Sequence, residues 1–143
     1  MTTAPEQLRR AFRDVPACRI ATIDGDGAPY VAARWFVWTE DGLFVSTRRG
    51  DATWQHAETD PRVSILIDRG RDWLELAGVR VDGTAELVAA EDPQVRRPMS
   101  AWHEKYRSFV AGEGFERLTE QVPALGFLLV HPGSLDAWDH RVG

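Results

Sequence analysis

Short apolar segments separated by tight turns follow one another along most of this chain, and this spacing constrains its fold more than any other feature. Strands are predicted at residues 17–24, 29–38 and 43–47, with turns at residues 25–27 and 39–42. Neighbouring strands joined in this way are antiparallel and form a β-meander. The alternation of strand and helix that is typical of a parallel sheet is absent from the sequence.

The strand pattern continues in the second half of the chain. Gly78 and Gly83 lie inside a segment that is predicted as one long strand or two bent halves, and they are candidate bends or bulges. Six or seven antiparallel strands, interrupted by isolated helices, favour a small split or closed β-barrel of the mainly β (α+β) class. The further predicted strands are residues 62–68, residues 73–88, and a last strand in two parts at residues 125–130 and 134–139.

Helices are predicted between these strands. Pro5 is favoured in the first turn of a helix that Pro16 ends. Asp51 is a candidate N-cap for a helix that reaches Thr59. The remaining predicted helices are residues 91–111, interrupted or kinked near Pro98, and residues 115–122.

The length of 143 residues predicts one domain, residues 1–143, with one core. The single Cys18 lies in an apolar strand, where we expect a buried, unreactive thiol. No segment has the length of a membrane span and the first residues do not resemble a signal peptide, so we expect a cytoplasmic protein without a membrane partner. The net charge of −5 argues against binding to duplex nucleic acid.

Motifs of conventional catalysis are missing from the sequence. Its four histidines show no paired ligand spacing, so we expect no metal site. No nucleophile elbow, Walker loop or dinucleotide-binding glycine motif occurs. The catalytic residues therefore stay unassigned.

Aromatic side chains instead stand beside clustered arginines. Strand alternation puts Arg34, Phe36 and Trp38 on one face and Trp35 with Val37 on the other. Residues 46–50 follow, with two hydroxyls, two guanidiniums and free backbone N–H groups, which together suit a phosphate. The alternative is that the aromatic side chains fill a barrel and the arginines form a solvated turn.

In these segments the chain resembles the pyridoxamine 5′-phosphate oxidase-like split β-barrel family, and specifically its actinobacterial flavin- or deazaflavin-dependent members. The resemblance rests on the order and spacing of several stretches, which together cover much of residues 17–88 and the C-terminus. The matching stretches are residues 19–31, 35–38, 43–50, 60–68, 79–88 and 132–139.

This resemblance implies a homodimer with a cofactor in a groove between the subunits. The cofactor phosphate would lie near Ser46 and Thr47, and its tricyclic ring against the strand that carries Trp35 and Phe36. The expected activity is that of an oxidoreductase that uses coenzyme F420, or alternatively FMN, to pass hydride to or from a small organic substrate. The candidate cofactor-binding residues are Arg34, Trp35, Phe36, Ser46, Thr47, Arg48, Arg49, Gly50, Thr53 and Trp73.

Two alternatives use the same fold without turnover: a carrier or sensor for a flavin, haem or another planar ligand, and a barrel with a structural role only. One departure from the family favours the carrier or sensor. Family members usually carry Arg or Lys where this chain has Asp51 and Thr53, so the usual phosphate contact is missing. We expect Arg48 and Arg49, or Arg34, to replace it.

Two further expectations concern aromatic residues. Six Trp, six Phe and two Tyr exceed what a small barrel can enclose, which supports a dimer interface. Trp102 and Tyr106 lie four residues apart on one face of a predicted helix. That face either packs onto the barrel or forms a lid over a substrate site.

Overall fold

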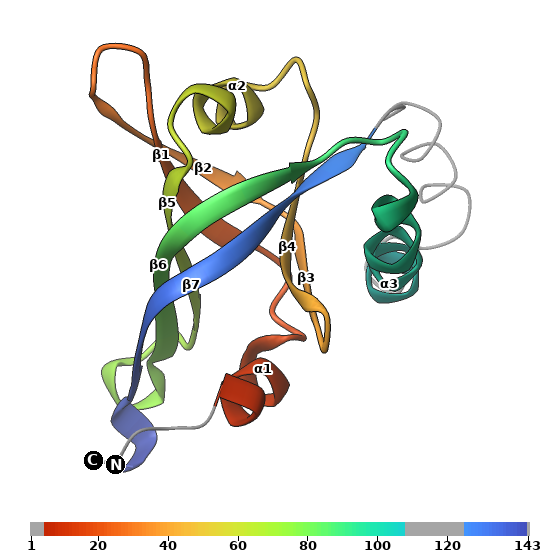
Figure 1. The fold of residues 1–143 in the computed structure, drawn as a ribbon. Helices are drawn as coiled ribbons and strands as arrows, with labels where there is room; N and C mark the ends of the chain where they lie inside the picture. Colours follow the sequence, from red (N-terminus) through yellow and green to blue (C-terminus); the bar gives the residue numbers. More distant parts are fainter. Residues whose placement is uncertain (1–4, 108–124, 143) are drawn as a thin grey trace.

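The computed structural model describes residues 5–107 and 125–142, and its strands form one antiparallel sheet. The order across this sheet is β2-β1-β5-β6-β7-β4-β3 (Figure 1). This sheet confirms the predicted mainly β class. Its strands are β1 (Cys18–Ile23), β2 (Pro29–Arg34), β3 (Phe36–Thr39), β4 (Gly42–Thr47), β5 (Arg62–Arg69), β6 (Ala77–Val88) and β7 (Gly126–Asp139).

The two outer strands of the sheet, β2 and β3, are neighbours in the sequence and are separated only by Trp35. The sheet must therefore curl until its edges approach each other. The backbone N–H of Ser46 in β4 donates to the Trp35 carbonyl at 2.9 Å, on the far side of that break. The result is the expected split barrel. The single strand predicted at residues 29–38 is wrong, because Trp35 leaves one ladder before Phe36 joins the other.

The long strands β6 and β7 pair along their whole length and form the spine of the sheet. Their register shifts between Asp82 and Gly83, which confirms the predicted bulge at Gly83. A side chain at this position would overlap the His131 carbonyl oxygen. The bulge lets β7 continue through Pro132, where the last strand was expected to be divided into two parts. Residues 73–75 of the predicted strand 73–88 instead form a short 3₁₀ turn.

The helices lie around the outside of the curled sheet, as Figure 1 shows. The helix expected from residue 91 begins only at Arg96, and Pro98 lies in its first turn, where no intrahelical N–H bond is lost. It is therefore not interrupted. The predicted helix at residues 115–122 lies outside the described residues. The helices are α1 (Pro5–Phe12), α2 (Ala52–Thr59) and α3 (Arg96–Arg107), with 3₁₀ turns η1 (Trp73–Glu75), η2 (Pro93–Val95) and η3 (His140–Val142).

Two apolar clusters cover the two faces of β3. Phe36 and Trp38 contact the main core inside the barrel, and Trp35 and Val37 belong to a smaller cluster under α3. The alternation predicted for these residues is confirmed. Cys18 is fully buried in the main core, and its burial raises the thiol pKa to about 12, so the thiol is unreactive as expected.

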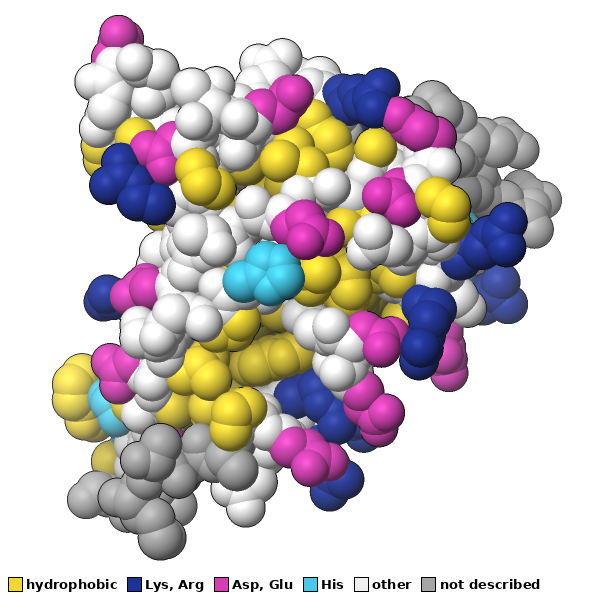
Figure 2. All heavy atoms as spheres, in the orientation of Figure 1, with side chains coloured by type: hydrophobic (Ala, Val, Ile, Leu, Met, Phe, Trp, Pro, Cys, Tyr) yellow, Lys and Arg dark blue, Asp and Glu magenta, His cyan; other side chains and the backbone are white. Residues whose placement is uncertain are grey.

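Charged side chains of both signs are interleaved on the face shown in Figure 2, where hydrophobic side chains gather over the upper part and in a hollow below the centre. This face therefore presents no continuous basic tract of the kind that tracks a nucleic-acid backbone. Among the described helices, none has the length and apolar character needed to cross a bilayer.

Candidate functional site

A hollow of about 300 Å³ lies where the ends of β2 and β4 meet the start of α2. A second hollow of about 390 Å³ shares the Arg48 and Asp51 side chains with it. Together these two hollows unite most of the residues that the sequence predicted for cofactor binding. The predicted residues that line them are Arg34, Trp35, Ser46, Thr47, Arg48, Arg49 and Gly50.

Three predicted site residues lie elsewhere. The Phe36 ring is fully buried in the main core and lines neither hollow. Thr53 is 1% exposed, at the start of α2 and behind Arg34. Trp73 is 72% exposed in η1, the light-green segment at the opposite end of β6 from α2 (Figure 1), where its ring contacts His140. Within one chain, Trp73 cannot contact a ligand in either hollow.

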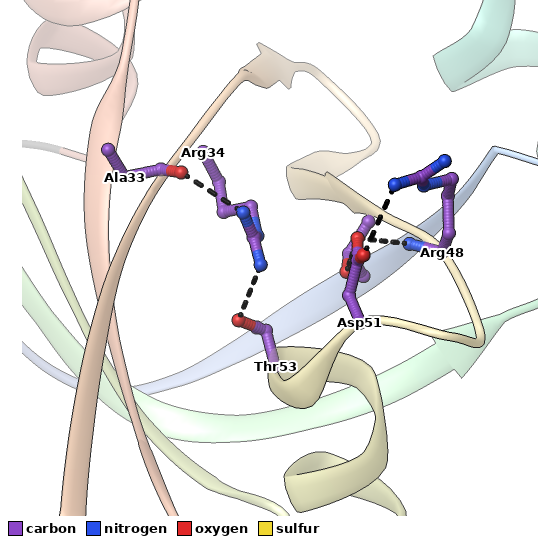
Figure 3. A network of polar contacts seen from close by, with 6 residues as sticks. Ala33, Arg34, Arg48, Asp51 and Thr53 are labelled. Carbon is purple, nitrogen blue, oxygen red and sulfur yellow. Dashed lines mark hydrogen bonds and ion pairs between the residues drawn. The ribbon is translucent and has the colours of Figure 1, made fainter. Parts of the chain in front are cut away.

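Arg34 is the basic residue of the site that has no acidic partner among residues 5–107 and 125–142. Its Nη2 donates to the Thr53 hydroxyl at 3.2 Å and its Nη1 to the Ala33 carbonyl at 3.4 Å (Figure 3). Its Nε is buried and has no hydrogen-bond partner in the described chain. Arg34 also lines the hollow, so its guanidinium can pair with an anionic ligand there. Thr53 therefore orients a cation instead of supplying one.

The Asp51 carboxylate turns back toward the end of β4 (Figure 3). Its Oδ2 accepts hydrogen bonds from the Thr47 hydroxyl at 3.2 Å and from the Arg48 backbone N–H at 3.1 Å. The Arg48 guanidinium lies 3.5 Å from Oδ1. Asp51 occupies the N-cap position of α2, as predicted, but its side chain makes no cap hydrogen bond. The donors of the preceding turn hold it instead.

Arg49 is the third guanidinium of the site, and it is paired with Glu91 across the second hollow. Two thirds of the Arg49 side chain is exposed, so solvent screens this pair. With Arg48 on Asp51 and Arg49 on Glu91, the three guanidiniums and two carboxylates leave one positive charge, and it lies on Arg34.

The hydroxyl of Ser46 is engaged inside the protein. It donates to the Trp35 carbonyl at 2.8 Å and accepts from the Trp102 indole N–H at 3.3 Å. The Thr47 hydroxyl donates to Asp51 as described above. Internal acceptors therefore take both protons in this structure, and a role of the two hydroxyls as phosphate donors stays a prediction.

Aromatic side chains form the other wall of the hollow. Trp35 and Trp102 both line it, with ring centroids 5.5 Å apart. Trp35 also stacks on Tyr106, with centroids 4.0 Å apart and an interplanar angle of 7°. Trp102 and Tyr106 are buried on one face of α3, so the helix packs on the barrel. Sequence reasoning placed both on one helix face and did not assign Trp102 to the site.

Lys105 was also missed, because it lies outside the predicted motifs. It lines a groove of about 700 Å³ between α1, the β3–β4 turn and α3, separate from the two hollows. Its Nζ donates to the Phe36 carbonyl at 2.9 Å and lies 3.6 Å from the centroid of that residue's ring. Burial lowers the pKa of Lys105 to about 8. The following residue, Tyr106, has its pKa raised by burial.

A family model described as pyridoxamine 5′-phosphate oxidase matches residues 4–137, which is nearly the whole chain. The chain belongs to this family. Its curled seven-stranded sheet agrees with that assignment and with the family resemblance read from the sequence. No curated protein sequence matches the chain.

Solved structures of similar fold show how widely this oxidase-type barrel is used. A conserved hypothetical protein of Mycobacterium tuberculosis has a TM-score of 0.80 and 23% identity, over 99% of this chain and 88% of that one. A haem storage protein of Vibrio cholerae has a TM-score of 0.72 and 20% identity, over 99% of both chains. An F420 reductase has a TM-score of 0.66 and 17% identity, over 95% of this chain and 98% of that one. At these identities the likeness establishes the fold alone.

The side chains that converge on the hollow supply positive charge and aromatic surface. In the described part of the chain, no three His, Cys, Asp or Glu side chains gather in a way that would hold a metal ion. The groups that converge are a guanidinium without an acidic partner, two indoles and a self-contained acidic turn. Such groups orient a ligand and its charge.

Proposed function

We propose that this protein binds the deazaflavin coenzyme F420 in the hollow beside Arg34 and acts as an oxidoreductase on a small organic substrate. The observation that carries this proposal is the guanidinium of Arg34, whose buried Nε has no acceptor in the described chain, next to the indoles of Trp35 and Trp102. A guanidinium binds an oxyanion and an aromatic wall binds a planar ring. The family assignment and an F420 reductase of the same fold support it.

The charge of the site favours F420 over FMN. The phosphodiester of F420 carries one negative charge, whereas a phosphate monoester such as that of FMN carries about 1.5 to 2 at neutral pH. The positive charge left on Arg34 matches the diester. An FMN phosphate would bring nearly twice this charge close to Asp51. We therefore expect weaker binding of FMN, which we keep as the alternative cofactor.

The chain's own residues bind and orient in this proposal. Arg34 would hold the phosphodiester, with Thr53 fixing the guanidinium through its hydroxyl. Trp35 and Trp102 would flank the ring and exclude water from it. The cofactor supplies the hydride chemistry. This division of labour explains why the sequence contains no nucleophile motif and no acid–base dyad.

A non-catalytic haem or planar-ligand carrier is the second candidate. It is favoured by two solved structures of the same fold, the haem storage protein of Vibrio cholerae and a haem-binding protein of Mycobacterium smegmatis. Among the described residues, however, the hollow beside Arg34 is lined by no His, Cys, Met or Tyr that could bind a haem iron. This lining favours a metal-free ring.

We also propose a homodimer whose second subunit completes the groove. Large apolar side chains stand exposed at the ends of the sheet. Trp73 and Leu74 are 72% and 73% exposed in η1, and Val31 in the outer strand β2 is 63% exposed. Exposed apolar groups of this size are typical of an interface.

Parallel absorbance and fluorescence titrations with F420, FMN and haemin test these proposals. The wild-type protein should bind F420 more tightly than FMN. Arg34→Met should weaken F420 binding by about tenfold or more. Arg62→Met is the matched control, because Arg62 is exposed and paired with Asp60 beyond the other end of α2.

Each outcome of these titrations has a defined meaning. Failure of F420 and FMN to bind, or equal affinity of the wild type and Arg34→Met, would reject the proposed site. Saturable binding of haemin alone would support the carrier. Binding of F420 without hydride transfer to any of a panel of small organic acceptors would support a deazaflavin carrier.

A further inference from the structure

Asp51 takes up the donors of its turn in the way a bound anion would. The turn offers a hydroxyl from Thr47, a backbone N–H from Arg48 and the Arg48 guanidinium. All three converge on the Asp51 carboxylate, at 3.2, 3.1 and 3.5 Å. Hydroxyl, backbone N–H and guanidinium are also the groups with which proteins hold phosphate oxygens. An anion from outside the chain would have to displace this carboxylate.

The Asp51 side chain lies where it can affect the binding of a ligand. Its side chain is 22% exposed and lines both hollows, so it faces the space that a ligand would enter. It is not needed as a helix cap, because it makes no side-chain cap bond to α2. Arg34 lines the same hollow and keeps a buried Nε without an acceptor in the described chain. The anion position of the turn is therefore filled from within, and the neighbouring Arg34 has no acidic partner among the described residues.

We propose that Asp51 is a built-in anion that determines ligand specificity, by filling the anion position of the turn at residues 47–51 and repelling phosphate monoesters. This inference rests on the proposed function. The site then selects planar ligands whose acidic group carries a single charge, such as a phosphodiester, and directs that group to Arg34. A dianionic phosphate monoester is repelled, because the donors of the turn that would bind it are already bonded to the negatively charged Asp51 carboxylate.

Substitution of Asp51 separates its charge from its occupancy. Asp51→Asn keeps one oxygen, which can accept the bonds from the Thr47 hydroxyl and the Arg48 backbone N–H, and removes the charge, whereas Asp51→Ala removes both the oxygens and the charge. FMN affinity should rise by about tenfold in Asp51→Asn and further in Asp51→Ala. The affinity for riboflavin, which has the same ring without phosphate, should stay within about twofold. Chemical denaturation establishes that each variant is folded.

The matched control is Asp60→Asn. Asp60 lies at the other end of α2, is paired with Arg62, and carries the same charge without lining either hollow. Its substitution should leave the ratio of FMN to riboflavin affinity unchanged. Equal changes for FMN and riboflavin in the Asp51 variants, or no change for either, would overturn the inference. So would an equal gain for FMN in Asp60→Asn.

Inorganic phosphate tests the inference independently of any flavin. In Asp51→Ala, the amide NMR resonance of Arg48 should shift saturably with added phosphate at constant ionic strength, and in the wild type it should not. The same response in both proteins would overturn the inference. Flavin binding by none of the proteins, combined with a phosphate response only in Asp51→Ala, would reject the proposed function and leave the assignment of Asp51 intact.

Discussion

The phenol oxygen of Tyr106 accepts a hydrogen bond from the backbone N–H of Phe36 at 2.8 Å in the core of the protein. The same hydroxyl has the Pro16 carbonyl at 2.8 Å and the Phe36 carbonyl at 3.0 Å as acceptors. One side chain of α3 thus joins the segment before β1 to the start of β3. Both segments adjoin residues that line the hollow, Ala17 and Trp35.

We predict that Tyr106→Phe destabilises the protein. The substitution keeps the ring and leaves the buried N–H of Phe36 without its acceptor, which costs about 1–3 kcal/mol of unfolding free energy. Chemical denaturation measures it. The control is Tyr30→Phe, because Tyr30 is 39% exposed, and its effect should stay within about 0.5 kcal/mol. Equal losses of unfolding free energy in the two variants would show that the hydrogen bond from the Phe36 N–H to Tyr106 does not stabilise the protein.

Lys105 provides a prediction about pH. Burial lowers its pKa from 10.5 to about 8, so between these values the unfolded chain binds more protons at this residue than the folded protein does. The contribution of Lys105 to the unfolding free energy therefore rises as the pH increases from about 8 to 10.5. The stability of the wild type relative to Lys105→Met should increase over this range.

The sequence makes this measurement clean, because Lys105 is the one lysine in it. A sample labelled with isotope in lysine gives one side-chain signal, whose NMR titration reports the pKa directly. Denaturation at several pH values gives the stability difference, in which the other titrating groups cancel. A midpoint near 10.5, or a difference that is flat or falls with pH, would contradict the prediction.

The sequence allowed much of the fold to be predicted, because turns and strand alternation are local features. The turn at residues 24–28 is an example: the Asp24 carboxylate accepts the N–H groups of Asp26 and Ala28, both at 2.9 Å. The break at Trp35 was not predictable from its neighbours. It depends on closure of the barrel, which brings β4 against the Trp35 carbonyl. A contact between distant segments leaves no local pattern.

The site was predicted in part for the same reason. The turn at residues 46–50 and Arg34 could be recognised by their residue types, and they do line the hollows. Which arginine keeps a free donor could not be recognised, because it depends on pairing across the fold. Arg49 pairs with Glu91 forty-two residues later, whereas Arg34 bonds to the Thr53 hydroxyl and the Ala33 carbonyl and has no acidic partner among the described residues.

Gly78 provides a prediction about close packing. It was expected as a bend or bulge, but the β6–β7 register is regular there, and Trp138 lies opposite. A methyl group on Gly78 would come within 2.7 Å of Trp138 Cε2. Gly78→Ala should cost about 1–3 kcal/mol of unfolding free energy. Gly25→Ala, where a methyl group meets nothing within 4 Å, is the control.

A double-mutant cycle shows whether Trp138 causes that cost. In a Trp138→Ala background the overlapping ring is gone, so Gly78→Ala should be nearly neutral. Additive losses of unfolding free energy would mean that Gly78 is needed for the backbone conformation at this position and not to make room for the Trp138 ring.

Sedimentation tests the proposed homodimer. Analytical ultracentrifugation should give a dimer at micromolar concentration for the wild type. If the exposed side chains of η1 lie in the interface, Trp73→Glu should shift the equilibrium toward monomer, because it places a charge in an apolar contact. The control is Glu75→Gln, a substitution of similar size in the same turn that adds no charge. A wild-type monomer would exclude a groove between subunits.

The last prediction ranks the three arginines of the site by their effect on F420 binding. The expectation from sequence was that Arg48 and Arg49, or Arg34, replace the missing basic residues. In the structure their charges are already paired, with Asp51 and Glu91, and Arg34 has no acidic partner in the described chain. Arg34→Met should therefore weaken F420 binding by about tenfold or more, and Arg49→Ala by less than about twofold.

Arg48→Ala should have an intermediate effect, because removing this partner exposes the charge of Asp51 to the ligand. High salt should reduce the difference between Arg48→Ala and the wild type, since both Arg48 and Asp51 are reached by solvent. It should reduce the loss in Arg34→Met less, because the Arg34 Nε is buried. Calorimetric titration at two ionic strengths measures all of these affinities. A larger loss of F420 affinity in the Arg48→Ala/Arg49→Ala double variant than in Arg34→Met would show that Arg48 and Arg49, and not Arg34, bind the anionic group of the cofactor.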